Sequence, residues 1–598
     1  MSERIPRELL FGNPEKSSPK ISPNGLHWAY LAPDEGVLNV WLGLEGRNAR
    51  PLTSDRGRGI RVFLWAEDER SILYLQDANG DENWHLFQTD LESGATRDLT
   101  PYPGVQAQIV ATEPRFPDEI LVALNDRDPK VHDVWRVKLG DGSRSLEAQN
   151  PGDAIGWLAD HEFKIALHKA MTPEGGTVLR VRDGAGWRDF LTCGPDDQLG
   201  AHGFAPNGDL YVESSVDRDT TALLQVPLAG GQSVVLAEHP ESDLGGVLLH
   251  PRRYHAEAAS FEVDRIQWKV LDPSLKMDFF AMAALQGDVT VVSRNDADTV
   301  WYLLVNKPDA SPAFLRWNRV GRVATPLFKT RPRLDPYTLA PMLPVKYAAR
   351  DGLEVRGYLT TPAGAEAKGL PLVLIVHGGP WVRDRWGFNP EAQWLASLGY
   401  AALQLNYRGS SGFGKRHLHA GDREWGAKMQ DDLTDGVKWA VEQGIADPAR
   451  VAIYGGSYGG YAALAGAAFT PGVYRCAIDV VGPSNLITLI KSIPPYWEPM
   501  KRVFDLRVGS VDTEEDFLKS RSPLFHVDKI GIPLLIAQGA HDPRVKQAES
   551  EQIVSALRLK DKPVEYLLYP DEGHGFAKPA NRLDFYAKAE AFLAKHLA

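Results

Sequence analysis

The stretch "VAIYGGSYGGYAALAG" (Val451–Gly466) places one serine among four glycines, after a β-branched run and before an alanine-rich one. The first run is typical of a strand and the second of a helix, so Ser457 falls on the turn between them. Gly455 to Gly459 fits G-x-S-x-G, the nucleophile elbow, in the strand–turn–helix context that this motif requires. Glycine avoids the clashes that side chains would make at so sharp a turn. The pattern predicts a nucleophilic serine.

An acid and a histidine follow Ser457 in the order that an α/β-hydrolase fold requires. The segment "LLIAQGAHDPRV" places Asp542 directly after one expected strand, and "YLLYPDEGHGF" places His574 after the next. A serine hydroxyl is a poor nucleophile unless a base takes its proton. We predict His574 as general base and then general acid, and Asp542 as the group that fixes its tautomer and stabilises the imidazolium. Weaker alternatives adjoin these residues: His541, Asp571 and Glu572.

The reaction also needs hydrogen-bond donors for the oxyanion. The segment "VLIVHGGP" ends an expected strand with bare glycine amides. We assign one donor to the backbone amide of Gly379 and the other to that of Tyr458, directly after the nucleophile.

The C-terminal part, 336–598, alternates apolar strands with helical periods. Strands are expected at 370–377, 401–407, 450–455, 476–482, 533–539 and 564–570, and helices at 427–443, 546–559 and 581–597. Continuous Val, Ile and Leu strands between helices predict a mostly parallel, doubly wound sheet covered on both faces. Chemistry in such sheets sits at the carboxyl ends of the strands.

The part before it, 21–335, reads as short strands that repeat. The segments 22–42 and 66–87 each give a turn, an apolar strand, an Asp/Gly turn and an aromatic strand. A period of about 40 to 50 residues is typical of β-propeller blades, and this length holds about seven of them. Residues 1–20 form an N-terminal extension, and the proline-rich "TRPRLDPYTLAPMLP" is a plausible linker.

Composition bounds the function further. The chain has 598 residues, too many for one core, and a formal net charge of -12, which argues against nucleic-acid binding. Its only two cysteines, Cys193 and Cys476, suit a reducing compartment. No signal-peptide pattern and no apolar run of about 18 residues occur, so we expect a cytoplasmic protein without a membrane span. No metal motif occurs, and no cofactor is implied.

Four segments together resemble a known family: "HGGPWVRDRWGFNPEAQWLASLGYAALQLNYRGSSGFGK", "GGSYGGYA", "QGAHDPRV" and "DEGHGF". They are similar to the prolyl oligopeptidase family of serine peptidases, nearest the acylaminoacyl-peptidase branch. The resemblance implies short peptide substrates, a propeller that screens out folded ones, and frequent self-association. It implies that Arg544 holds a substrate carbonyl. Phe413 stands where prolyl oligopeptidases proper have an oxyanion-donating tyrosine, so both donors should be backbone amides.

Specificity is less constrained. The segment "NLITLIKSIPPYWEPM" predicts an apolar pocket with Tyr496 or Trp497 in its wall. Arg383 and Arg385 could instead bind a carboxylate, which keeps a carboxypeptidase that recognises a free C-terminus as an alternative. Dipeptidyl peptidases of the family grip an amino terminus with a glutamate pair from the propeller. The clear Glu-Glu pair of this sequence lies at 514–515, which disfavours that activity.

Two further alternatives remain from the sequence. One is a carboxylesterase or amidase on the same scaffold, and the other, outside enzymes, is a propeller interaction module joined to an inactive hydrolase domain. The complete Ser-Asp-His set and the oxyanion loop disfavour the inactive module, whereas the ratio of the rates on matched ester and peptide substrates would separate an esterase from a peptidase.

Overall fold

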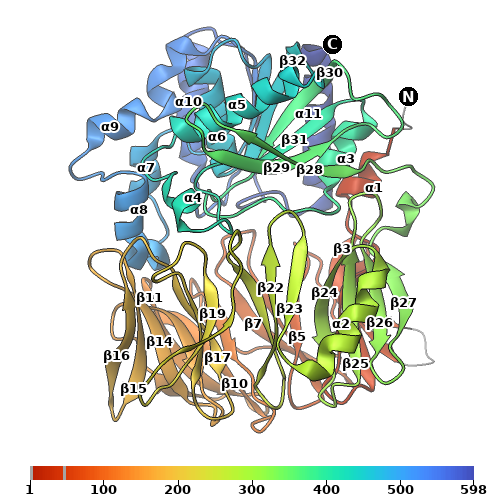
Figure 1. Cartoon of the computed structure of the whole chain (residues 1–598), viewed down its shortest axis with the longest axis vertical. Helices are drawn as coiled ribbons and strands as arrows, with labels where there is room; N and C mark the ends of the chain where they lie inside the picture. Colours follow the sequence, from red (N-terminus) through yellow and green to blue (C-terminus); the bar gives the residue numbers. More distant parts are fainter. Residues whose placement is uncertain (1–3, 45–48) are drawn as a thin grey trace.

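The repeats of the N-terminal half fold into a seven-bladed β-propeller, seen in the lower half of Figure 1. The structure is a computed structural model that describes residues 4–44 and 49–598. Among these residues, the sixth blade along the chain has three antiparallel strands and each of the other six blades has four. The blades are β1–β4 (within 17–51), β5–β8 (62–98), β9–β12 (107–148), β13–β16 (154–193), β17–β20 (199–237), β21–β23 (244–270) and β24–β27 (288–329).

The two repeats recognised in the sequence are the central strands of the first two blades. They form β2 (His27–Asp34) with β3 (Val37–Leu44), and β6 (Ser71–Gln76) with β7 (His85–Asp90). Apolar residues of these blades share one core, in which Leu31 and Val40 of the first blade meet Ile72 of the second. Each blade therefore buries a face against its neighbour, which explains the repeated pattern.

Within residues 4–44 and 49–598, the first and last blades of the propeller share no strand. The strand β1 (Ser17–Ile21) packs beside β24 (Asp288–Arg294), and the Ile21 amide donates a hydrogen bond to Ser293 Oγ at 3.1 Å. In the sixth blade, helix α2 (Lys276–Met282) follows β23 (Ile266–Val270) where the other blades have a fourth strand.

The C-terminal part forms one eight-stranded sheet in the order β28-β29-β31-β30-β32-β33-β34-β35. Its strands are β28 (Met342–Ala348), β29 (Glu354–Thr360), β30 (Leu370–Val376), β31 (Ala401–Asn406), β32 (Ala446–Gly456), β33 (Cys476–Val480), β34 (Leu534–Gly539) and β35 (Val564–Tyr569). The first two strands pair antiparallel and the other six are parallel. All six strands predicted from the sequence are present, and the predicted fold class is confirmed.

Helices cover both faces of this sheet. One face packs against α5 (Lys428–Glu442), α6 (Tyr458–Phe469) and α10 (Gln547–Leu559), and the other against α3 (Pro390–Ser397) and α11 (Pro579–Leu597). The shorter helices of this part are α4 (Lys415–His419), α7 (Leu486–Lys491), α8 (Lys501–Arg507) and α9 (Glu515–Ser520). Among the described residues, no helix is both long and apolar enough to cross a bilayer.

The segment expected to be an N-terminal extension contains α1 (Arg7–Phe11), which packs against α3 and α11. The ring of Phe11 stacks on that of Tyr586 with centroids 3.4 Å apart. The first helix of the chain therefore completes the core of the C-terminal domain rather than that of the propeller.

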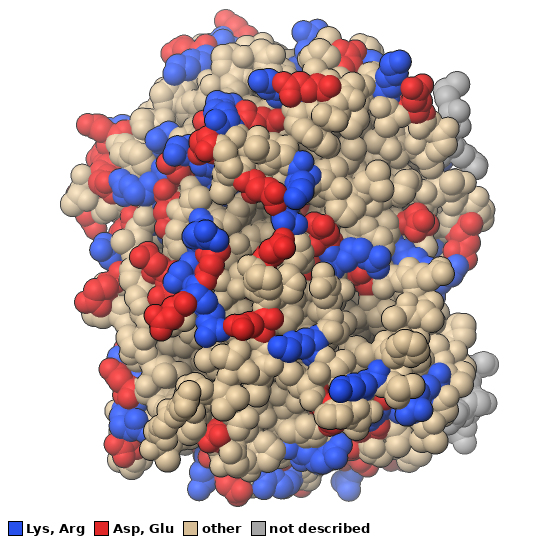
Figure 2. Space-filling model, in the orientation of Figure 1, with Lys and Arg blue, Asp and Glu red and all other residues tan. Residues whose placement is uncertain are grey.

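The propeller covers the carboxyl edge of the parallel strands. Loops that follow β31 and β34 contact propeller residues, as when the amide of Gly412 donates to Asp243 and Arg544 pairs with Glu82. On the face drawn in Figure 2, acidic and basic side chains are interspersed, and no basic stripe of the kind that suits nucleic acid crosses it.

Candidate active site

Ser457 stands on a strained turn between β32 and α6. Its φ of 57° and ψ of -120° lie outside the regions that residues other than glycine favour. A Cβ on Gly459 would lie 2.0 Å from the carbonyl oxygen of Val376, and one on Gly455 would lie 2.5 Å from the carbonyl carbon of Gly459. Side chains are therefore excluded at both positions, which is why the turn needs glycine there.

Asp542 and His574 arise from the loops that follow β34 and β35, two adjacent parallel strands. His574 Nδ1 lies 2.7 Å from Asp542 Oδ2. The other carboxylate oxygen accepts the backbone N–H groups of Arg544 and Val545, both at 2.9 Å. Asp542 is 3% exposed, so the carboxylate is fixed by three hydrogen bonds and orients the imidazole ring.

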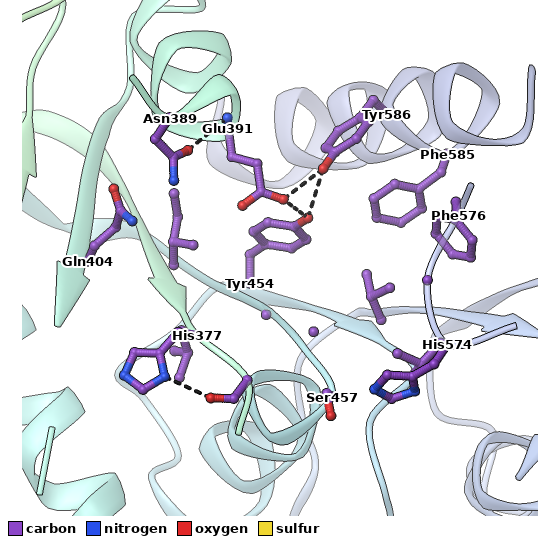
Figure 3. A pocket seen from close by; sticks show the side chains of 18 of the residues that line it. His377, Asn389, Glu391, Gln404, Tyr454, Ser457, His574, Phe576, Phe585 and Tyr586 are labelled. Carbon is purple, nitrogen blue, oxygen red and sulfur yellow. Dashed lines mark hydrogen bonds between the residues drawn. The ribbon is translucent and has the colours of Figure 1, made fainter. Parts of the chain in front are cut away.

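The hydroxyl of Ser457 lies beside the His574 ring (Figure 3), and both residues line the same two cavities. In the part of the chain that the structure describes, this hydroxyl makes no hydrogen bond. Catalytic hydrogen bonds are often long before substrate binds. The structure thus brings the three predicted residues into one site, in which the hydrogen bond from Ser457 to His574 is not yet formed.

The two amides assigned to the oxyanion flank Ser457. Gly379 lines a cavity with Ser457 and has a φ of 108°, a conformation that favours glycine. Tyr458 is the first residue of α6, so its N–H has no partner within the helix. The positive end of the helix dipole adds to the stabilisation of a negative charge at this point.

An apolar cavity of about 340 Å³ opens beside Ser457. Its wall holds several large side chains: Trp381, Trp425, Leu489, Ile493, Trp497, Met500 and Phe504. Of the two aromatic residues predicted for such a pocket, Trp497 is in the wall, whereas Tyr496 is outside it and donates its hydroxyl to Glu82 at 3.2 Å. The sequence did not indicate Trp381 and Trp425, which come from two other loops.

A carboxylate of the propeller pairs with an arginine in the wall of this cavity. Glu82 lies between β6 and β7 with a left-handed φ of 59°. It pairs with Arg544, which lines the cavity, at 2.9 Å. The same loop presses on the loop of His574, because a Cβ on Gly80 would lie 2.6 Å from the amide nitrogen of Gly573. The sequence around Glu82 indicated a turn, but not that this turn faces the second domain.

The arginines suggested as a carboxylate site lie elsewhere. The guanidinium of Arg383 donates to the carbonyl oxygens of Glu262 and Val263 at 2.6 and 2.9 Å, and lies 4.1 Å from the centre of the Phe413 ring. Arg385 pairs with the Glu262 carboxylate. Among the described residues that line the two cavities at Ser457, neither arginine occurs. Both instead join the propeller to the second domain.

Two overlapping propeller clusters bring a histidine close to carboxylates: His250, Glu257 and Asp298; and His255, Glu257 and Asp272. The guanidinium of Arg294 lies 2.5 Å from Glu257 and 3.5 Å from Asp298, which already balances their charge. Nδ1 of His250 accepts two backbone N–H groups, so the ring carries its proton on Nε2, the atom that faces Asp298. These contacts describe an ion-pair network rather than a metal centre.

A strained serine, a buried Asp-His pair and a helix N-terminus at the carboxyl edge of this sheet define a serine hydrolase of the α/β-hydrolase fold. The model of the prolyl oligopeptidase family matches residues 386–598. Dipeptidyl aminopeptidase BIII of Pseudoxanthomonas mexicana is 43% identical over all of this chain and 89% of its own. The chain therefore belongs to the prolyl oligopeptidase family and is a serine peptidase.

Other relatives agree with this assignment. The acylamino-acid-releasing enzyme of Arabidopsis thaliana is 30% identical over 38% of this chain and 30% of its own. The solved structure of a puromycin-hydrolyzing peptidase of Mycobacterium tuberculosis superposes with a TM-score of 0.79 at 21% identity, over 100% of this chain and 97% of that one. The predicted resemblance, including that to acylaminoacyl-peptidases, is confirmed.

Proposed function

We propose that this peptidase releases dipeptides from the free amino terminus of short peptides, and that Ser457 is its nucleophile. The observation that carries the proposal is the Glu82 carboxylate beside the apolar cavity, since an ammonium group pairs well with a carboxylate there. The relative that matches the whole chain at 43% identity is named as a dipeptidyl aminopeptidase. The sequence disfavoured this activity because no Glu-Glu pair occurs in the propeller, but one glutamate from a left-handed turn can serve.

The chemistry follows from the geometry of the site. His574 takes the proton of the Ser457 hydroxyl as the oxygen attacks the scissile carbonyl. The amides of Gly379 and Tyr458 stabilise the oxyanion, and Asp542 stabilises the imidazolium. His574 then gives its proton to the leaving amine, and water hydrolyses the acyl-enzyme by the same route.

The separation between the Glu82 carboxylate and the Ser457 hydroxyl would set the number of residues that are released. With the terminal ammonium at Glu82 and the side chain of the second residue in the apolar cavity, the carbonyl group of that second residue would lie at Ser457. Arg544 lies between these points and would donate to the intervening carbonyl oxygen, as the family resemblance implies. An acylated terminus carries no positive charge that could pair with Glu82. Release of an acylated residue is therefore the second candidate function, behind dipeptide release.

The remaining alternatives have less support. A carboxypeptidase would need arginines at the cavities beside Ser457, whereas Arg383 and Arg385 are not among the described residues that line them and pair with propeller groups. An esterase or amidase would not need Glu82. A propeller module with an inactive hydrolase domain would not need the buried Asp542 to be held by three hydrogen bonds.

One peptide in four forms tests the proposal. Ala-Phe-Ala-Ala would be offered with each end free or blocked by acetyl and amide groups, and the products identified by mass spectrometry. We expect Ala-Phe release from both forms with a free amino terminus, whatever the state of the carboxyl end. Preferential cleavage of the acetylated forms would contradict the proposal.

We also propose a reducing, cytoplasmic location, because Cys193 and Cys476 are both buried free thiols. Self-association stays a prediction from the family resemblance, and sedimentation of the purified protein would test it.

A further inference from the structure

A second cavity, of about 470 Å³, also has Ser457 and His574 in its wall. It lies on the face of the sheet covered by α3 and α11. Gln404, Ile375 and Tyr454 stand side by side in its wall, because they pair across β31, β30 and β32. Figure 3 shows that Gln404 and Tyr454 face it from the sheet and Glu391 from α3. Apart from Ser457 and His574, none of the described residues lines both this cavity and the apolar one.

The wall of this cavity carries hydrogen-bond acceptors without donors. The Gln404 amide donates to Asp384 Oδ1 at 3.0 Å, and both Asp384 Oδ2 and Gln404 Oε1 are buried without a hydrogen-bond partner among the described residues. Gln404 is 1% exposed. Burial raises the pKa of Asp384 to about 7. A buried acceptor without a donor is costly.

Glu391 adds a second carboxyl group to the same wall. It accepts hydrogen bonds from the hydroxyls of Tyr454 and Tyr586, the latter at 2.7 Å (Figure 3). Because both tyrosines bond to the same oxygen, the other oxygen of Glu391 stays available to a further donor.

The cationic groups of the lining do not serve these acceptors. Arg582 lines the cavity, but its guanidinium donates to the carbonyl oxygens of Phe576 and Ala577 and to Asn13. It also donates to a carbonyl of α1. Burial lowers the pKa of His377 to about 4, so that ring is neutral.

We propose that this cavity is the subsite for the side chain that follows the scissile bond, and that it selects arginine or lysine at that position. The inference rests on the proposed role of Ser457. With the preceding side chain in the apolar cavity, the leaving part of the peptide must lie on the other side of the nucleophile. A guanidinium or ammonium group brings several donors to Asp384, Gln404 and Glu391, and its positive charge favours the ionised form of the two carboxyl groups.

Matched peptides test this subsite. Ala-Phe-Arg-Ala, Ala-Phe-norleucine-Ala and Ala-Phe-Glu-Ala differ only after the scissile bond, and kcat/KM for each would be measured by separating the products. We expect the arginine peptide to exceed the norleucine peptide by about tenfold or more, the gain typical of a hydrogen bond to a charged group. The glutamate peptide should be the slowest.

Two variants connect the preference to the cavity. In Asp384→Asn and in Glu391→Gln, the ratio of the arginine rate to the norleucine rate should fall toward one. Using both variants keeps the test valid if one of them does not fold. Circular dichroism would check the fold of each.

Three results would overturn the inference. Equal rates for the arginine and norleucine peptides in the wild type would mean that the cavity holds only solvent. A preference that survives in both variants would place the selection elsewhere. Failure of the wild type to cleave any of the three peptides between Phe and the next residue would overturn the proposed function, and this inference with it.

Discussion

Replacing Glu82 by glutamine tests how the peptidase recognises the amino terminus. The carboxylate accepts hydrogen bonds from Arg544 and Tyr496, and its side chain is 14% exposed. Glutamine keeps the shape but loses the charge. A hydrogen bond to a charged group is worth about 1.5 to 3 kcal/mol, so kcat/KM for a substrate with a free terminus should fall by about 10- to 150-fold.

The stability of the enzyme should change little in this variant. The Arg544 side chain is 43% exposed, and ion pairs near the surface contribute at most about 1 kcal/mol. A large loss of activity would therefore reflect weaker recognition of the substrate rather than unfolding of the enzyme.

The assay compares Ala-Phe-p-nitroanilide with its acetylated form in the wild type, in Glu82→Gln and in Glu35→Gln. Glu35 is a matched control, because it lies in the corresponding turn of the first blade, between β2 and β3, with a left-handed φ of 50°. Only Glu82→Gln should lower the ratio of the free to the acetylated rate. The same ratio in all three proteins would refute the role of Glu82 in binding the amino terminus.

Three further predictions concern the catalytic residues and the buried carboxyl. Asp542→Asn should lower kcat by about 10⁴-fold with little change in KM, because the amide favours the wrong tautomer of the histidine; a loss below tenfold in steady-state kinetics would contradict this. Gly459→Ala should lower Tm and soluble yield, because its Cβ would lie 2.0 Å from the Val376 carbonyl oxygen. Gly531→Ala, whose Cβ would meet none of the described atoms within 4 Å, should leave both unchanged. Equal Tm values for the two variants would contradict the packing argument. In the folded protein Asp384 keeps its proton up to about pH 7, whereas in the unfolded chain it loses the proton near pH 4. The free energy of unfolding should therefore fall as pH rises through this range, and Tm should fall more between pH 5 and pH 8 in the wild type than in Asp384→Asn. Parallel curves of Tm against pH would show that Asp384 is not the group responsible.

Much of the fold follows from local sequence. The apolar runs that become β30 to β34 are buried on both faces, so their composition alone indicates strands of a parallel sheet. The turn, strand and aromatic order of 22–42 recurs because each blade makes the same contacts with its neighbours. Asp542 and His574 could be predicted because parallel strands bring their carboxyl ends to one edge.

The parts that could not be predicted depend on how the two domains dock. Glu82 is one of many turn glutamates in the propeller, and only the docked structure places it beside Arg544. The partners of Arg383 are backbone carbonyls, which carry no sequence signal. The packing of α1 joins residues more than 500 positions apart, as in the contact of Phe11 with Tyr586.

The central claim is that Ser457 is the hydroxyl that attacks the peptide. A fluorophosphonate probe, followed by mass mapping of the labelled peptides, tests it most directly. We expect one adduct per chain, on Ser457, with peptide hydrolysis lost in proportion to labelling, and neither label nor turnover in a folded Ser457→Ala variant. An adduct on another residue, or hydrolysis that persists in that variant, would contradict the account.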